Sequence, residues 1–362
     1  MKNQIIGLFE QKKIKVNKLI ERNTSNIPGL LHGPIYRYEA YTDIGVLQLV
    51  IKSESIVAPP ELLFQNMYLD CANGILYQSV LNFKKYSKYL SMCNMPQRER
   101  LFYTHVPSSL QNFLPKVWGC VIHEDNQLII MEDLSDCINI DKIDNPEAWN
   151  REYLLQVMID LANIHHKLHD FEYNIVNAID FKIVKKYLLE FHNVSTYGCG
   201  IKMNSKVYSS GILFIEHIEE IEVLLSQDAT IIHNDFNIRN ICISKNKENI
   251  KVYDWEFWDI GCPMLDIVDF LISISTKYIN TYMIEEMIET YISNYYKLSG
   301  KNFNKRYCIK LLYYSALKYS ATRMNMYLLC YKKKRISFIE RMYDNLQKIL
   351  EICESNFGEG LY

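Results

Sequence analysis

A loop in the second half of the chain carries the residues best suited to catalysis. His233, Asp235 and Asn240 lie between two short apolar runs that are typical of strands, and Asp254 follows a third such run. Transfer of a phosphoryl group from a nucleotide requires a carboxylate that orients the acceptor hydroxyl and takes its proton, and oxygen ligands that hold Mg²⁺. Asp235 fits the first role, and Asn240 and Asp254 fit the second. Because loops at strand ends can meet around one cleft, the pattern favours phosphoryl transfer.

The same stretch resembles the catalytic region of the aminoglycoside phosphotransferase and choline kinase superfamily, which has a protein-kinase-like fold. The family pattern is H-x-D-x-x-x-x-N, followed after a strand hairpin by a D-[WF]-E segment and a further Asp. This chain has H-N-D-F-N-I-R-N at 233–240, D-W-E at 254–256 and then Asp266. Several polar positions agree in order and spacing, so the match is specific for a short motif.

The resemblance implies a role for each matched residue. Asp235 is expected to be the catalytic base, and Asn240 and Asp254 are expected to hold Mg²⁺. His233 and Asp266 are expected to hold the catalytic loop in place, and a structural role is also the ordinary interpretation of His233. The phosphoryl donor implied by the family is ATP or GTP.

The resemblance extends to two residues upstream. In family members a lysine on the third N-terminal strand pairs with a glutamate on the following helix. Lys52 ends the strand-like run VLQLVIK and fits the lysine. Glu99, in QRERLFY, resembles the glutamate of an RE-x-x-FY helix in related small-molecule kinases, whereas the competing Glu61 follows two prolines. Because Lys52 and Glu99 are 47 residues apart, residues 53–95 are expected to be an insertion.

The run LIIMEDLSD at 128–136 resembles the hinge between the lobes of such kinases. There the backbone of Glu132, Asp133 and Leu134 is expected to hydrogen-bond the nucleotide base. The alternative is an ordinary strand followed by a helix cap. Since a hinge of this kind contacts the base through the backbone, the side chains do not select ATP over GTP.

The expected acceptor is a small molecule. Asp266 follows Asp254 by only 12 residues, which leaves no room for the activation segment of a protein kinase. Aminoglycoside-type enzymes bind cationic substrates with acidic residues, and Glu256 and Asp259 lie beside the expected metal site. The glutamates at 285, 286 and 289 are further candidates, for which a solvated helix face is the alternative.

Two alternative functions are compatible with the same motifs. Choline and ethanolamine kinases also have H-N-D and D-[FW]-E, but their tryptophan-containing C-terminal segment is missing, because the four Trp are at 118, 149, 255 and 258. A catalytically silent kinase-like binding protein, such as a spore-coat-type relative, is the other alternative. We therefore expect an amine-bearing metabolite or antibiotic as acceptor, with choline or ethanolamine as the second choice.

The elements that must position these residues divide the chain into two unequal lobes. Residues 1–24 are expected to begin the chain as a helix, and a β-hairpin is expected at 35–52, whereas long helical periodicity dominates after Leu134. The sequence thus predicts an α+β, two-lobed protein-kinase-like fold. A small β-rich nucleotide-binding lobe at 1–133 precedes a larger, mainly helical lobe at 134–362 that carries the catalytic loop and the acceptor site.

Composition limits the partners. The chain has 362 residues, with 40 basic against 42 acidic residues, so it lacks the basic excess of a general nucleic-acid binder. It has no run of 18 apolar residues, and its N-terminal apolar stretch is too short for a signal peptide. A cytoplasmic protein that binds a nucleotide, Mg²⁺ and a small acceptor, and neither nucleic acid nor a membrane, is the expectation.

Overall fold

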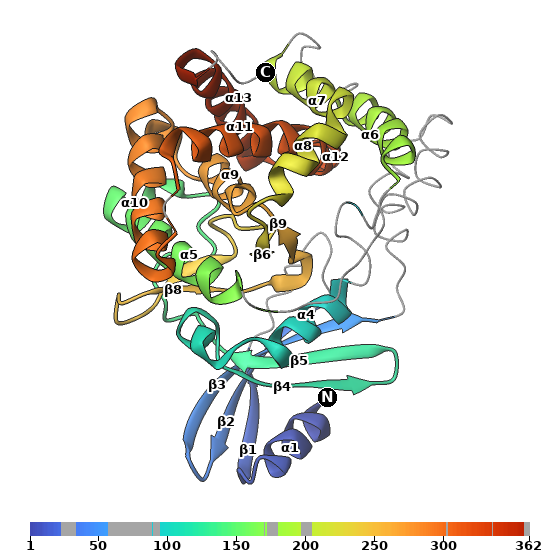
Figure 1. The fold of residues 1–362 in the computed structure, drawn as a ribbon. Coiled ribbons are helices and arrows are strands. Elements are labelled where there is room, and N and C mark those ends of the chain that lie inside the picture. Colours follow the sequence, from blue (N-terminus) through green and yellow to red (C-terminus); the bar gives the residue numbers. More distant parts are fainter. Residues whose placement is uncertain are drawn as a thin grey trace.

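The computed structural model describes most of the chain in nine segments. These are residues 1–22, 34–56, 89, 95–169, 171, 180–196, 205–301, 303–334 and 336–357. They form a small sheet-based N-terminal part and a larger helical part, which lie at opposite ends of the molecule (Figure 1). The expected two-lobed fold is confirmed.

The N-terminal part is built on one antiparallel sheet. Its strands are β1 (Val16–Arg22), β2 (Ile35–Thr42), β3 (Gly45–Ser55), β4 (Val117–His123) and β5 (Asn126–Glu132). The strand order is β1-β2-β3-β5-β4, so β3 lies in the centre. The expected β-hairpin is β2–β3, closed where Thr42 pairs with Gly45, which has the positive φ of 121° that favours glycine.

The chain begins with a helix that is shorter than expected. Helix α1 (Lys2–Gln11) is followed by Lys13, which has a left-handed φ of 60°, and the run VNKLIER then forms β1. The expected helix over 1–24 is therefore wrong from Val16 onward, because this run gains a full ladder of hydrogen bonds at the edge of β2. Helix α1 instead packs on the sheet, where the rings of Phe9 and Trp118 lie 5.2 Å apart.

Helix α4 (Met95–His105) crosses from the sheet to the C-terminal part (Figure 1). Its buried residues include Glu99 and Phe102. The ring of Phe102 stacks on that of Trp255 at 3.9 Å, and Trp255 begins the 3₁₀ helix η4 (Trp255–Phe257). This contact positions the helix against the segment that follows Asp254.

The C-terminal part consists mainly of helices. They are α5 (Arg151–His169), α6 (Phe181–Thr196), α7 (Lys206–Glu216), α8 (Ile218–Ser226), α9 (Met264–Ser273), α10 (Thr281–Ser299), α11 (Lys305–Ala321), α12 (Arg323–Lys334) and α13 (Ser337–Phe357). All ten residues of α9 are buried, and α9 packs against α11 and α13. This helix is the centre of the core and the support of the catalytic loop. Within the segments listed above, no helix is both long and apolar enough to cross a bilayer.

Two short strand pairs frame the catalytic loop. They are β6 (Thr230–Ile232) with β9 (Asp259–Gly261), and β7 (Ile241–Ile243) with β8 (Ile250–Val252). Residues 233–240 connect β6 to β7, and Asp254 follows β8, as the sequence predicted. Of the expected insertion at 53–95, Ser53 to Ser55 belong to β3, while 57–88 and 90–94 lie outside the described residues.

Candidate active site

Asp235 lies in the loop between β6 and β7 and is held by neutral donors. The Nδ2 of Asn240 donates to its Oδ2 at 2.7 Å and to its backbone carbonyl at 3.0 Å. The Nδ2 of Asn237 and the hydroxyl of Tyr327 donate to its Oδ1 at 3.2 and 3.1 Å. The carboxylate is therefore fixed in orientation while none of these three partners carries an opposite charge.

Asp266 on α9 holds the loop from beneath. Its Oδ2 accepts the backbone N–H of His233 at 2.8 Å, and its Oδ1 accepts that of Asn234 at 2.7 Å. Asn234 has a left-handed φ of 61°, and these two bonds support that conformation. The ring of His233 bonds the carbonyl of Tyr253 at 2.9 Å through Nε2 and the N–H of Asp235 at 3.3 Å through Nδ1. Both residues have the contacts expected of structural supports.

Asn240 and Asp254 supply the oxygen atoms that a magnesium site requires. Because Asn240 uses its amide nitrogen on Asp235, its Oδ1 is turned away from that residue. Asp254 has a left-handed φ of 68°, which places its carboxylate at the end of β8 beside the catalytic loop. Amide and carboxylate oxygens are the ligands that Mg²⁺ prefers, so this donor set fits the ion.

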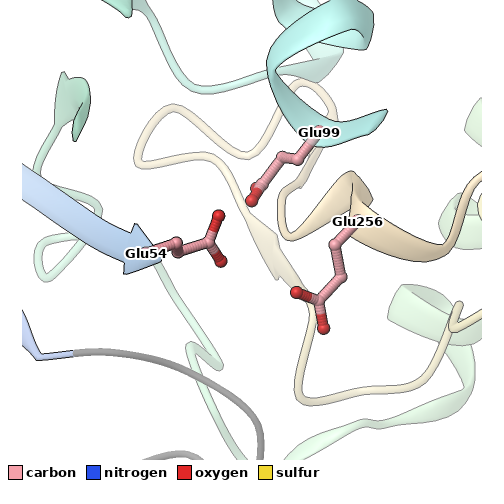
Figure 2. A group of neighbouring side chains, drawn as sticks. All are labelled: Glu54, Glu99 and Glu256. Atoms are coloured by element: carbon pink, nitrogen blue, oxygen red, sulfur yellow. The ribbon is translucent and has the colours of Figure 1, made fainter. Parts of the chain in front are cut away.

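Lys52 on β3 is surrounded by carboxylates. Its Nζ lies 2.6 Å from Asp254, 2.7 Å from Glu99, 2.9 Å from Glu54 and 3.7 Å from Glu256. Figure 2 shows that the three glutamates converge from β3, α4 and η4. Their ligand oxygens lie within 4.8 Å of one another, a spacing that a metal ion could bridge. The ammonium of Lys52 already contacts all three, so it acts as the cation of this cluster.

The cluster shifts the pKa values of its members. Burial by itself lowers the pKa of Lys52, but the four carboxylates, led by Asp254, raise it well above the ordinary value. Burial raises the pKa of Glu99 to about 8, with Lys52 opposing this shift and the neighbouring carboxylates adding to it. The lysine therefore stays charged, while Glu99 takes up a proton more readily than an ordinary glutamate.

The segment expected to be the hinge follows β5. The N–H of Glu132 donates to the carbonyl of Lys116 at 2.9 Å, and the N–H of Asp133 donates to the carbonyl of Gln48 at 3.0 Å. The carbonyl of Leu134 accepts the N–H of Cys137 at 2.8 Å. A nucleotide base at this segment would have to use its other backbone groups.

The residues expected at the acceptor site lie in different surroundings. Glu256 is 2% exposed and faces Lys52. Asp259 lies 3.5 Å from the guanidinium of Arg98 on α4. Of the further candidates on α10, those at 285 and 289 pair with Lys305, and the one at 286 pairs with Arg151. The structure thus does not gather these acids around Asp235.

Sequence reasoning missed two partners of the site. Glu54 lies two residues after Lys52 on β3 and contacts its ammonium. Because alternate residues of a strand point to the same face, the sequence did contain a signal for this contact. Tyr327 reaches Asp235 from α12, 92 residues along the chain, and no local pattern indicates that contact.

Comparison with known proteins supports the fold and the motif. Residues 205–291 match the model of the phosphotransferase enzyme family APH. No curated protein sequence gives a significant match. The structure resembles a choline/ethanolamine kinase family protein from Mesorhizobium loti, with a TM-score of 0.54 and 12% identity over 95% of this chain and 91% of that one.

Two further solved structures are similar. Choline kinase LicA from Streptococcus pneumoniae, in complex with AMP, gives a TM-score of 0.50 and 11% identity over 97% of this chain and 98% of that one. An aminoglycoside-3'-phosphotransferase of type VIII gives a TM-score of 0.42 and 12% identity over 83% and 93%. At such identities the first two likenesses establish the fold. The family match covers residues 205–291, which include the loop at 233–240, Asp254 and Asp266.

Proposed function

We propose that this protein is a small-molecule kinase that transfers the γ-phosphoryl group of ATP or GTP to a hydroxyl of a small, amine-bearing acceptor. The observation that carries the proposal is the 2.6 Å contact between Lys52 and Asp254, which are 202 residues apart. It brings a lysine of the central strand to the expected metal ligand, next to the loop that holds Asp235. A lysine, a metal-binding carboxylate and a base in one place are what phosphoryl transfer requires.

In the proposed reaction the acceptor hydroxyl binds against Asp235, which orients it and takes its proton. The acceptor oxygen forms a bond to the γ-phosphorus as the bond from that phosphorus to the β–γ bridging oxygen breaks, and the nucleoside diphosphate leaves. Lys52 would bind phosphate oxygens. Mg²⁺ held by Asn240 and Asp254 would neutralise charge on the β- and γ-phosphates. His233 and Asp266 would keep the loop in shape throughout.

The same proposal assigns a function to each of the two lobes. Residues 1–133 would form the nucleotide-binding lobe and residues 134–362 the lobe that carries the catalytic loop and the acceptor site. The nucleotide base would lie at residues 132–134, where the sheet ends. Glu99 would hold Lys52 in place, since it is fully buried on α4 and contacts the ammonium at 2.7 Å.

Amino alcohols are the acceptors to test first. One of the similar structures is a choline/ethanolamine kinase family protein, and the carboxylate of Asp235 would attract the amine of such an acceptor. Aminoglycosides, amino sugars and hydroxy amino acids carry the same two groups, a hydroxyl and an amine, and complete the panel.

The experiment is acceptor-dependent consumption of ATP or GTP with Mg²⁺ by the purified protein, for the wild type and for Asp235→Asn. We expect one acceptor to stimulate consumption and the variant to lose the stimulation while it still binds the nucleotide. Asp228→Asn is the matched control, because it makes the same change in a carboxylate that accepts a hydrogen bond from Tyr307 on α11. Undiminished turnover in Asp235→Asn would overturn the assignment of the base.

Thermal shift separates this enzyme from a silent relative. A protein that binds the magnesium nucleotide should gain about 2.7 kcal/mol at a hundred times the dissociation constant. If the melting temperature does not respond to either nucleotide, the chain is a binding protein that no longer uses this site.

A further inference from the structure

Arg239 is a charged residue of the catalytic loop to which the proposed reaction gives no role. It directly precedes Asn240. Its backbone N–H donates to Oδ1 of Asn237 at 3.0 Å, and its carbonyl accepts from the hydroxyl of Tyr253 at 2.5 Å. The backbone of Arg239 is therefore fixed, and so is the point from which its side chain extends.

The guanidinium of Arg239 extends toward Asp235, the expected base. Its Nη2 lies 3.9 Å from Oδ2 of Asp235, and the side chain is 36% exposed, against 8% for that of Asp235. A cation with this placement lies beside the carboxylate that would take the acceptor's proton, and therefore near the phosphoryl group that the acceptor would receive.

The guanidinium lies at ion-pair distance from Asp235 but does not form a close hydrogen bond with it. A separation of 3.9 Å is too long for a hydrogen bond, so Asp235 does not accept one from it. Among the residues that the structure describes, no oxygen atom accepts a hydrogen bond from this guanidinium. Lys52 differs, because its ammonium contacts four carboxylates. The charge of Lys52 is already balanced by these carboxylates. Arg239 can therefore offer its positive charge to the transferred phosphoryl group more readily than Lys52 can.

We infer that Arg239 is a catalytic residue that binds the equatorial oxygens of the phosphoryl group during transfer. The inference rests on the proposed function and adds a group to it. The bond changes are those of the proposed reaction, with the proton going to Asp235, and Arg239 stays protonated and forms no covalent bond. A planar guanidinium suits this role, because it is permanently charged and donates two parallel hydrogen bonds.

The first test compares kcat and KM for Arg239→Gln and Arg239→Lys with the acceptor found in the panel. Loss of a donor that acts in the transition state lowers kcat by about 10²- to 10³-fold, so we expect that loss for Arg239→Gln with little change in nucleotide KM. The kcat of Arg239→Lys should lie between those of Arg239→Gln and the wild type, because lysine keeps the positive charge but lacks the two parallel N–H donors of a guanidinium. Arg151→Gln is the matched control, since Arg151 is exposed and pairs with Glu286 on α10.

The second test separates charge stabilisation from a role in positioning Asp235. ADP with Mg²⁺ and aluminium fluoride mimics the planar phosphoryl group, and calorimetry gives its affinity relative to ADP alone. We expect the wild type to bind the fluoride complex more tightly than ADP, and Arg239→Gln to lose that gain while it keeps its affinity for ADP. Asp235→Asn should keep the gain.

The outcomes distinguish the inference from the function on which it rests. A wild type that binds no magnesium nucleotide would overturn both. An active wild type whose Arg239→Gln variant keeps kcat within about twofold, or keeps the tighter binding of the fluoride complex, would overturn the role of Arg239 and leave the kinase assignment intact.

Discussion

The two ends of the candidate site are stabilised in opposite ways. At Lys52 one buried ammonium contacts four carboxylates, and these come from β3, α4 and the segment after β8. At Asp235 one carboxylate accepts hydrogen bonds from two amides and a phenol, all neutral. A charged cluster depends on every ion in it and on pH, whereas neutral donors fix a carboxylate and leave its charge available. The lysine end is therefore the more fragile of the two, and the Asp235 end keeps a carboxylate that could take a proton in the proposed reaction.

The strongest test of this contrast removes the lysine. Lys52→Met leaves the buried carboxylates without their cation, and breaking such a pair from one side costs about 3–5 kcal/mol. Asp235→Asn keeps the shape of the side chain but turns an NH2 group toward one of its neutral donors, so it should cost about 1–3 kcal/mol, less than the loss of the lysine. Denaturant unfolding of both variants gives the comparison. Equal losses would mean that the two ends are not held differently.

A second test uses pH. Because burial raises the pKa of Glu99 to about 8, from a usual value near 4.5, the folded protein binds this proton more tightly than the unfolded chain. The resulting stabilisation is complete below about pH 4.5 and is lost as the pH rises through about 8, by at most about 1.4 kcal/mol per pH unit.

The matched variant for that test is Glu99→Gln. The free energy of unfolding of the wild type should fall between pH 5.5 and 8.5 more steeply than that of the variant. Burial also raises the pKa of Asp160 to about 6 and that of Asp269 to about 8, but both remain in the variant, so the difference in slope belongs to Glu99. Parallel slopes would mean that Glu99 is ionised throughout this range.

A smaller effect is expected at the base end. Tyr327→Phe removes one of the donors to Asp235 and leaves those of Asn237 and Asn240. A hydrogen bond of this kind is worth about 1.5 kcal/mol, so kcat should fall about tenfold while nucleotide affinity is unchanged. Tyr307→Phe is the control, because Tyr307 bonds Asp228 instead. A loss as large as that of Asp235→Asn would assign Tyr327 a direct part in proton transfer.

The sequence predicted the parts of this site that have local signals. The spacing of the catalytic loop, the strands around it and the hairpin that carries Lys52 are all properties of short runs. The contact between Lys52 and Glu99 crosses 47 residues and was found only through the motif around Glu99. The approach of Tyr327 depends on how α12 packs, which no pattern within that helix encodes. The run at 16–22 was assigned wrongly because an edge strand gains its stability from its neighbour.

The smallest effect is expected on the surface of α10. Glu285 and Glu289 share one partner, Lys305, in exposed ion pairs that contribute about 0–1 kcal/mol. Replacing both by Gln should leave the stability nearly unchanged and the KM of the acceptor the same. A large rise in that KM would place the acceptor on α10, away from the loop, and would require a different model of the cleft.

The stack of Phe102 on Trp255 has a mechanical consequence. Trp258 Nε1 also donates to the carbonyl of Arg98 at 2.7 Å, so α4 is attached at two points to the segment after Asp254. Glu99 and Asp254 therefore behave as parts of one rigid body, although the chain separates them widely. Any motion that opens the cleft must either unstack two buried rings or pivot about them. A pivot would move the N-terminal sheet relative to the C-terminal helices while the separation of Glu99 and Asp254 hardly changed.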